Sequence, residues 1–134
     1  MIVVDTNVIH YCWVHGQNTE IAQAVCDKDP EWHAPILWRS ELRNVLTAYL
    51  RRGVLTRAQI VWILGAADRA LAEREHILPA DLVLDVVASS ALTAYDAEFV
   101  ALALALSVPL VTADKGVLKA FPECALTMEA FLSA

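Results

Sequence analysis

Hydrophobic positions along the chain fall into short β-branched runs separated by longer segments with helical spacing. Residues 2–4 form a run of three apolar side chains, and Asp5 after them can cap a following helix. Over residues 38–52 the apolar side chains recur on one helical face, and Gly53 follows as a C-terminal stop signal. Residues 108–112 are again apolar and β-branched, which predicts a buried strand.

The segments between these landmarks continue the alternation of strand and helix. Thr56 with Gln59 and Thr93 with Asp96 have the spacing of helix-capping pairs. The pattern predicts further helices over residues 6–14, 20–27, 56–75, 81–92, 93–106 and 114–121, a terminal helical stub, and short strands over 33–36, 77–78 and 125–127. Short apolar strands alternating with helices indicate a parallel sheet covered on both faces. We therefore predict an α/β fold of three layers, α/β/α, around a short parallel sheet of four or five strands.

The composition of the chain is typical of a globular protein. Its 134 residues match the commonest domain size, so we predict a single domain over residues 1–134. Hydrophobic residues make up 57% and charged residues 19%, which excludes intrinsic disorder. The net charge of −6 argues against a protein that coats nucleic acid through bulk charge. No apolar run is long enough to cross a membrane and no secretory signal precedes the first strand, so we expect a cytoplasmic protein without membrane association.

Four carboxylates far apart in the sequence fall at one predicted edge of the sheet. Asp5 and Asp114 follow predicted strands, Asp96 begins a helix that leads into a strand, and Glu41 lies about one turn into its helix. Open α/β sheets bind ligands at the carboxyl ends of their strands, so these side chains are candidates for one site. Carboxylates packed together without a counter-ion repel one another, and a divalent cation such as Mg²⁺ or Mn²⁺ removes that conflict.

Each of these acids also has a structural explanation when it is taken alone. Asp5 could cap a helix, Asp96 could complete a capping box, Asp114 could shape a turn, and Glu41 could be an ordinary solvated helix residue. The sequence contains no nucleophile elbow and no phosphate-binding loop. The histidines show no ligand spacing; they are His10, His15, His33 and His76. A shared metal site is the interpretation that explains the four acids together.

Four segments of the sequence resemble PIN-domain nucleases in their order and spacing. They are Ile-Val-Val-Asp-Thr-Asn at 2–7, Arg-Ser-Glu-Leu-Arg-Asn-Val-Leu at 39–46, Leu-Thr-Ala-Tyr-Asp-Ala at 92–97 and Pro-Leu-Val-Thr-Ala-Asp at 109–114. The resemblance extends over nearly the whole chain, and it is greatest to the VapC-type toxins of bacterial toxin–antitoxin pairs.

This resemblance implies a metal-dependent endoribonuclease that hydrolyses phosphodiester bonds in RNA and has a cognate antitoxin protein as a partner. Carboxylate-held Mg²⁺ or Mn²⁺ suits that chemistry, because it can activate water and stabilise a leaving oxygen. The implied catalytic and metal-binding residues are Asp5, Glu41, Asp96 and Asp114, with Asn7 and Thr112 as supporting polar groups.

Arginines provide candidates for binding the RNA backbone. Five arginines lie between residues 39 and 57, where Glu41 is the only acid among them. Arg39 and Arg43 flank Glu41 on the predicted helix, so they could contact phosphates beside the metal. The same arginines could equally form a solvated helix face.

One predicted helix carries more apolar residues than a single buried face can hold. Residues 60–64 are five consecutive apolar positions and therefore wrap around the helix. We expect Trp62 or a neighbour to stay exposed in a monomer and to take part in a homodimer or in a groove for an antitoxin tail. The alternative is a helix that its neighbours bury all round.

Two other functions are compatible with the same architecture. A catalytically silent binding module could keep the PIN fold without cleaving RNA. Phosphatases of the haloacid-dehalogenase type also open with a strand and an aspartate. They require a second aspartate two residues later, and this chain has Asn7 there.

Overall fold

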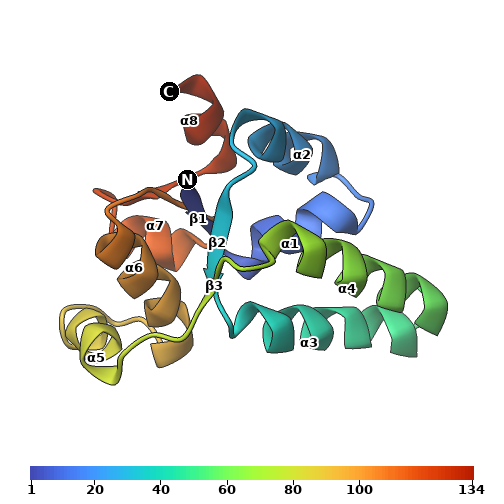
Figure 1. The fold of residues 1–134 in the computed structure, drawn as a ribbon, viewed down its shortest axis with the longest axis horizontal. Helices are drawn as coiled ribbons and strands as arrows, with labels where there is room; N and C mark the ends of the chain where they lie inside the picture. The colour runs from blue at the N-terminus through green and yellow to red at the C-terminus, as the bar shows by residue number, and fades with distance from the viewer.

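The computed structural model describes all 134 residues, which form a five-stranded parallel sheet with eight helices. The strands lie in the order β3-β2-β1-β4-β5 (Figure 1), and they are β1 (Ile2–Val4), β2 (Trp32–Pro35), β3 (Glu75–His76), β4 (Leu110–Val111) and β5 (Ala125–Leu126). The helices are α1 (Thr6–Trp13), α2 (Thr19–Lys28), α3 (Trp38–Arg51), α4 (Arg57–Leu71), α5 (Ala80–Ala88), α6 (Ala94–Leu106), α7 (Lys115–Ala120) and α8 (Met128–Ser133).

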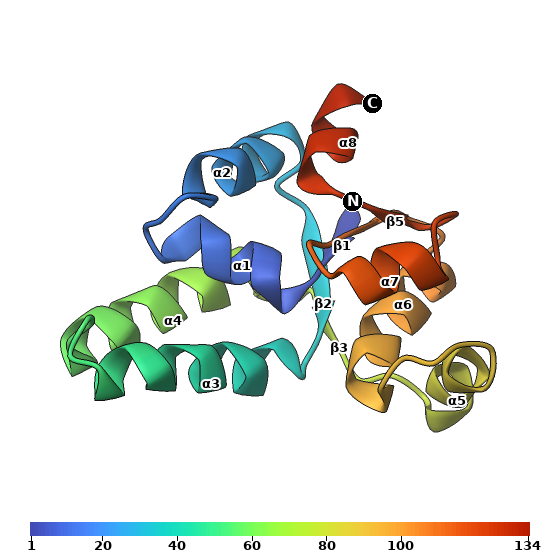
Figure 2. The ribbon, with the colours of Figure 1, turned by 180° about the vertical axis from the view of Figure 1, so that it is seen from behind.

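The helices cover both faces of the sheet, as the two opposite views in Figures 1 and 2 show. Helices α1 to α4 lie on one side, and α5, α6 and α7 lie on the other, which confirms the predicted three-layer fold. The chain moves from β1 outward to β2 and β3, and then returns past β1 to β4 and β5. The direction of winding therefore reverses between β1 and β4, and ligands of open α/β sheets bind beyond the carboxyl ends of such strands.

The central strands are short and apolar because both of their faces are covered. Every residue of β1, β2 and β4 is buried. Helix α6 has buried residues around most of its circumference, since it packs against β1, β2 and β4 and also against α5. None of the helices combines the length and the apolar character needed to cross a membrane.

The edge strand β3 differs from the sequence prediction. A helix was expected to extend to residue 75 and a strand to occupy residues 77–78, but α4 ends at Leu71 and β3 is Glu75–His76. Ile77 is 83% exposed and lies outside the sheet. The reason is tertiary: Ala34 and Pro35 of β2 pair with two polar residues of β3 whose side chains find partners across the sheet.

Smaller differences concern the ends of other elements. Helix α5 ends at Ala88 rather than at residue 92, because the hydroxyls of Ser89 and Ser90 donate to the carbonyl of Val86 and close the last turn. The strand expected over 33–36 begins and ends one residue earlier. The strands expected over 108–112 and 125–127 contain only the two residues of β4 and of β5 that pair.

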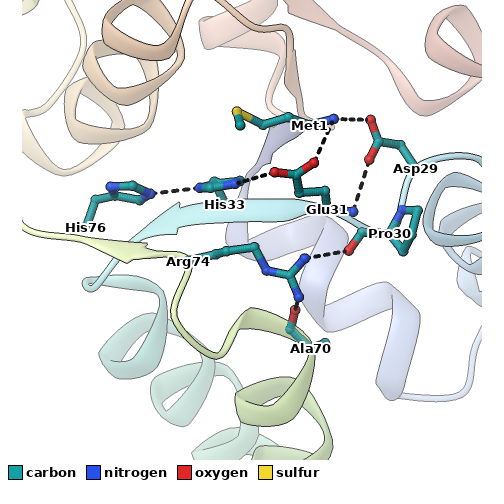
Figure 3. Close-up of polar contacts among 8 residues, drawn as sticks. All are labelled: Met1, Asp29, Pro30, Glu31, His33, Ala70, Arg74 and His76. Carbon is teal, nitrogen blue, oxygen red and sulfur yellow. Dashed lines mark hydrogen bonds and ion pairs between the residues drawn. The ribbon is translucent and has the colours of Figure 1, made fainter.

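Polar side chains reinforce the edge where β3 joins β2, as Figure 3 shows. The rings of His33 and His76 meet at 2.8 Å between Nδ1 and Nε2, and Glu31 lies 3.5 Å from Nε2 of His33. Arg74, just before β3, donates to the carbonyl of Pro30 at 3.4 Å. These contacts join residues 43 and 44 positions apart in the sequence, so spacing could not have paired them.

Glu75 of β3 holds the first turn of α3. Its Oε1 accepts hydrogen bonds from the indole of the buried Trp38 (2.6 Å) and is 2.6 Å from Nε of Arg39. The guanidinium of Arg39 also pairs with Asp68 on α4. One carboxylate thus connects the edge strand to the start of the helix that carries Glu41.

Removal of this carboxylate should destabilise the protein. Glu75→Ala leaves the buried indole N–H of Trp38 without an acceptor, so we expect the free energy of unfolding to fall by about 2 kcal/mol. The matched control is Glu123→Ala, which removes an exposed loop carboxylate without hydrogen bonds and should change stability by less than about 0.5 kcal/mol. Urea denaturation measures both variants, and equal stability of the two would contradict the role assigned to Glu75.

Candidate functional site

Asp5 is the most enclosed of the four predicted acids, with only 8% of its surface exposed. Its Oδ1 accepts a hydrogen bond from the backbone N–H of Thr6 at 2.7 Å and so caps α1. Its Oδ2 accepts from the hydroxyl of Thr112 at 2.7 Å and from the amide of Asn7 at 3.4 Å. Asp5 is therefore a helix cap, as one interpretation of the sequence held. Capping alone does not explain why a carboxyl group is buried there with no cationic side chain beside it.

Thr6 links Asp5 to Glu41, which lies one turn into α3. The buried hydroxyl of Thr6 donates to Oε1 of Glu41 at 2.7 Å, while its backbone N–H binds Asp5. The sequence analysis did not identify Thr6 as a site residue. One feature of the sequence could have indicated Thr6 as a site residue, namely its place directly after Asp5, at the first position of α1.

The loops after β1 and β4 are joined by the two predicted supporting residues. The hydroxyl of Thr112, which is fully buried, donates to Asp5 and accepts from the backbone N–H of Asp114 at 3.0 Å. Oδ1 of Asn7 accepts from the backbone N–H of Ala113 at 3.2 Å. Asp114 in turn caps α7. Both loops are thereby fixed with respect to each other at the point where the winding of the sheet reverses.

Asp96 approaches the same edge from α6, on the other face of the sheet. Its backbone N–H donates to the hydroxyl of Thr93 at 3.2 Å, as the capping pattern predicted. Glu98 lies two residues further along α6, and its negative charge acts on Glu41. Glu98 is a fifth acid that the sequence analysis missed, because residues two apart on a helix point in different directions and give no spacing signal.

Burial and neighbouring negative charges raise the pKa values of Asp5, Glu41 and Asp96. Burial raises the pKa of Asp5 to about 6, against the hydrogen bonds from Thr112 and Thr6, and the charges of Glu41 and Asp96 add to the effect. Burial also raises the pKa of Glu41, to which the charges of Asp96 and Glu98 contribute. The pKa of Asp96 is raised by burial and then by the charge of Asp114. Each of the four predicted acids therefore interacts with at least one of the others.

No cationic side chain of the protein neutralises this cluster. The five ion pairs of the structure all involve other acids. The array is open, since no three His, Cys, Asp or Glu side chains lie close enough together to hold one metal ion. Mg²⁺ commonly uses one or two carboxylates, several waters and substrate phosphates, so an open set of oxygen donors fits this cation or Mn²⁺ in chemistry and in charge.

The two arginines predicted to contact phosphates have different surroundings. The guanidinium of Arg39 pairs with Asp68 and Glu75 and is part of the contact between α3 and β3. Arg43 is exposed and makes no ion pair; its guanidinium donates to the carbonyl of Arg39 at 3.1 Å and to the hydroxyl of Ser40 at 3.4 Å. Arg43 is thus the one of the two whose charge faces solvent without an acidic partner.

Comparisons with known proteins agree with this architecture. The family model described as PIN domain matches residues 2–122, a range that contains all four acids. Among solved structures, the crystal structure of FitAcB from Neisseria gonorrhoeae is similar to this chain with a TM-score of 0.73. Sequence identity to it is 21%, and the match covers 96% of this chain and 99% of that chain. A search of the curated proteins found no match. At this identity the structural likeness shows the fold alone.

The raised pKa of Asp5 predicts a pH-dependent stability without divalent cations. Stability from a carboxyl whose folded pKa exceeds its unfolded value is present below about pH 4 and is lost as the pH rises through about 6. Asp5→Asn removes this loss. We expect its stability relative to the wild type to rise by up to about 3 kcal/mol between pH 4 and pH 7.5. Chemical denaturation in a chelator measures the difference, and a difference independent of pH would contradict the burial of an ionised Asp5.

Proposed function

Because the chain belongs to the PIN domain family, whose members are generally nucleases, we propose that it is a metal-dependent endoribonuclease. In this proposal it hydrolyses phosphodiester bonds of RNA in the cytoplasm and is the toxin of a toxin–antitoxin pair. The observation that carries the proposal is the set of mutually repelling carboxylates without a cationic partner, placed where the winding of the sheet reverses. Such a set favours binding of a divalent cation and, through it, of a phosphate.

Asp5, Glu41, Asp96 and Asp114 are the residues that would hold Mg²⁺ or Mn²⁺. Waters and a substrate phosphate would supply the remaining ligands, because no three of these carboxylates lie close enough together to hold one ion by themselves. When bound, such a cation would make a nearby water more acidic and neutralise negative charge that develops on the phosphate. The chain itself keeps the carboxylates in place. Thr112 and Thr6 hold both oxygens of Asp5, and Thr6 occupies only Oε1 of Glu41, so that its second oxygen stays available. Asn7 secures the loop that carries Asp114.

An acidic protein that binds RNA needs local positive charge, and α3 provides it. Arg43 has no acidic partner, so it is the residue that we assign to a phosphate of the RNA. It lies two residues after Glu41 and therefore on a different side of α3, so this phosphate flanks the one at the metal site. Arg39 is assigned a weaker contact, because Asp68 and Glu75 already use its donors.

The partner surfaces in this proposal lie on α4. Val61 and Trp62 on α4 are 55% and 64% exposed, while Ile63 of the same helix is buried. The apolar run of α4 therefore extends beyond its buried face. Trp62 also lines a cavity of about 260 Å³ between α4 and the end of α1. We assign this surface to a homodimer contact or to an antitoxin tail, one of whose basic side chains would neutralise the carboxylates.

Cleavage of RNA tests the proposed activity. Purified protein should cleave RNA in Mg²⁺ or Mn²⁺ and stop when a chelator is added. Asp96→Asn should reduce the rate at least about 100-fold, because catalysis by a bound cation contributes several kcal/mol. The matched control is Asp81→Asn, an exposed residue on α5 without ion pairs, which should cleave like the wild type.

Thermal unfolding gives a second measurement that does not depend on cleavage. Mn²⁺ should raise the Tm of the wild type more than that of Asp96→Asn. Equal cleavage by Asp96→Asn and the wild type would refute the assigned site. RNA binding without cleavage by the wild type would favour the catalytically silent module.

Dissociation of a dimer tests the assignment of α4. We expect sedimentation to show a homodimer and Trp62→Asp to shift it to monomer, because a charge would be buried in the contact. The control is Leu84→Asp, which changes a residue that is 60% exposed on α5. If Leu84→Asp dissociates the dimer and Trp62→Asp does not, the interface lies on α5 and the assignment of α4 is wrong.

A further inference from the structure

A second cavity adjoins the candidate site and is not used by the activity proposed above. It has a volume of about 280 Å³ and lies between α1, α7 and the start of α8, beyond the carboxyl ends of β4 and β5. Helices α1 and α7 lie on opposite faces of the sheet, in the region where its winding reverses (Figure 2). The cavity therefore occupies the position at which open α/β sheets bind ligands.

The cavity shares a wall with the carboxylate cluster. Thr112 lines it, and the hydroxyl of the same residue donates to Oδ2 of Asp5 at 2.7 Å. The neighbouring Ala113 also lines it and is held by Asn7. A molecule in this cavity is separated from Asp5 by one side chain, so an RNA with its scissile phosphate at the carboxylates would reach the cavity with an adjacent nucleotide.

Four polar side chains line the cavity without a partner in the protein. The hydroxyl of Tyr11, the amide of Asn18, the ammonium of Lys115 and the exposed carboxylate of Glu129 take part in no hydrogen bond or ion pair of the structure. Asn18 precedes α2 without capping it. By contrast, Thr127 on the same wall uses its hydroxyl to cap α8. Unpartnered polar groups that converge on a small cavity are typical of a site that recognises a polar ligand.

We propose that this cavity, which we name the base pocket, binds one nucleobase of single-stranded RNA beside the scissile phosphate. The inference rests on the proposed ribonuclease function. An Asn amide offers a donor and an acceptor to a base edge, and the ring and hydroxyl of Tyr11 provide a stacking surface and a further hydrogen bond. Lys115 contacts the phosphate that joins this nucleotide to the next. Asn18 and Tyr11 are thus specificity-determining residues of the cleavage reaction.

The distribution of cleavage positions in a randomised RNA tests this proposal. The wild type should prefer certain bases at one position near the cut, and Asn18→Ala and Tyr11→Phe should each reduce that preference about fivefold or more. Both variants should retain the Mn²⁺-induced rise in Tm, because neither residue belongs to the carboxylate cluster. The matched control is Gln17→Ala, an exposed neighbour of Asn18 outside the cavity, which should keep the wild-type preference.

A second measurement separates the base pocket from the proposed activity. Binding of a short RNA with 2-aminopurine to Asp96→Asn protein should change the fluorescence of that base, as it leaves the RNA stack for the ring of Tyr11, and Asn18→Ala added to this protein should abolish the change. If the wild type cleaves no RNA, the proposed function fails, and this fluorescence still decides for or against the base pocket. An unchanged base preference in Asn18→Ala and Tyr11→Phe would overturn the inference. Binding of an antitoxin peptide that depends on Asn18 and Tyr11, together with RNA binding that does not depend on them, would also overturn the inference.

Discussion

The constraint on which this structure depends is the burial of a negative charge between the first and fourth strands. Asp5 is almost completely enclosed, and no cationic side chain of the protein pairs with it. An uncompensated buried carboxylate is costly, and the raised pKa of Asp5 expresses that cost. The fold tolerates it because Thr6 and Thr112 satisfy both oxygens with hydrogen bonds. Capping of α1 requires a hydrogen-bond acceptor at this position but not a charge, so the charge is the feature for which the proposed metal site accounts.

Much of the surrounding structure fixes the geometry of this position. Thr112 and Asn7 connect the loops after β1 and β4, and Thr6 extends the connection to Glu41. Further away, Glu75 of the edge strand holds the first turn of α3, and therefore the helix that presents Glu41. Most of these contacts are hydrogen bonds between buried or half-buried groups, and the exception is the exposed bond between Asn7 and Ala113. A functional array whose members repel one another needs this kind of support from the residues around it.

The charge distribution bears on how an acidic protein could bind the polyanionic substrate proposed for it. The net charge is −6, yet α3, which carries Glu41, also carries arginines, and Lys115 follows Asp114 directly at the start of α7. A divalent cation bound at the four carboxylates would offset part of their negative charge. Charge and position in the sequence do not by themselves identify a phosphate contact. Arg39 lies close to Glu41 in the sequence, but its guanidinium is largely engaged in ion pairs within the fold.

The sequence by itself determined the class of fold and most of the helices, and it predicted that four acids lie at one edge of the sheet. These features are local: β-branched runs, helical periodicity and capping residues such as Thr56 and Thr93 act within a few residues of the chain. The tertiary structure alone decided where β3 lies, because a strand of two polar residues forms only when β2 offers a pairing edge and partners for Glu75 and His76. It likewise decided that Thr6 and Glu98 join the candidate site. Thr6 on α1 donates a hydrogen bond to Glu41 on α3, and the charge of Glu98 on α6 acts on the same carboxylate. A spacing pattern within one element cannot encode such interactions between elements.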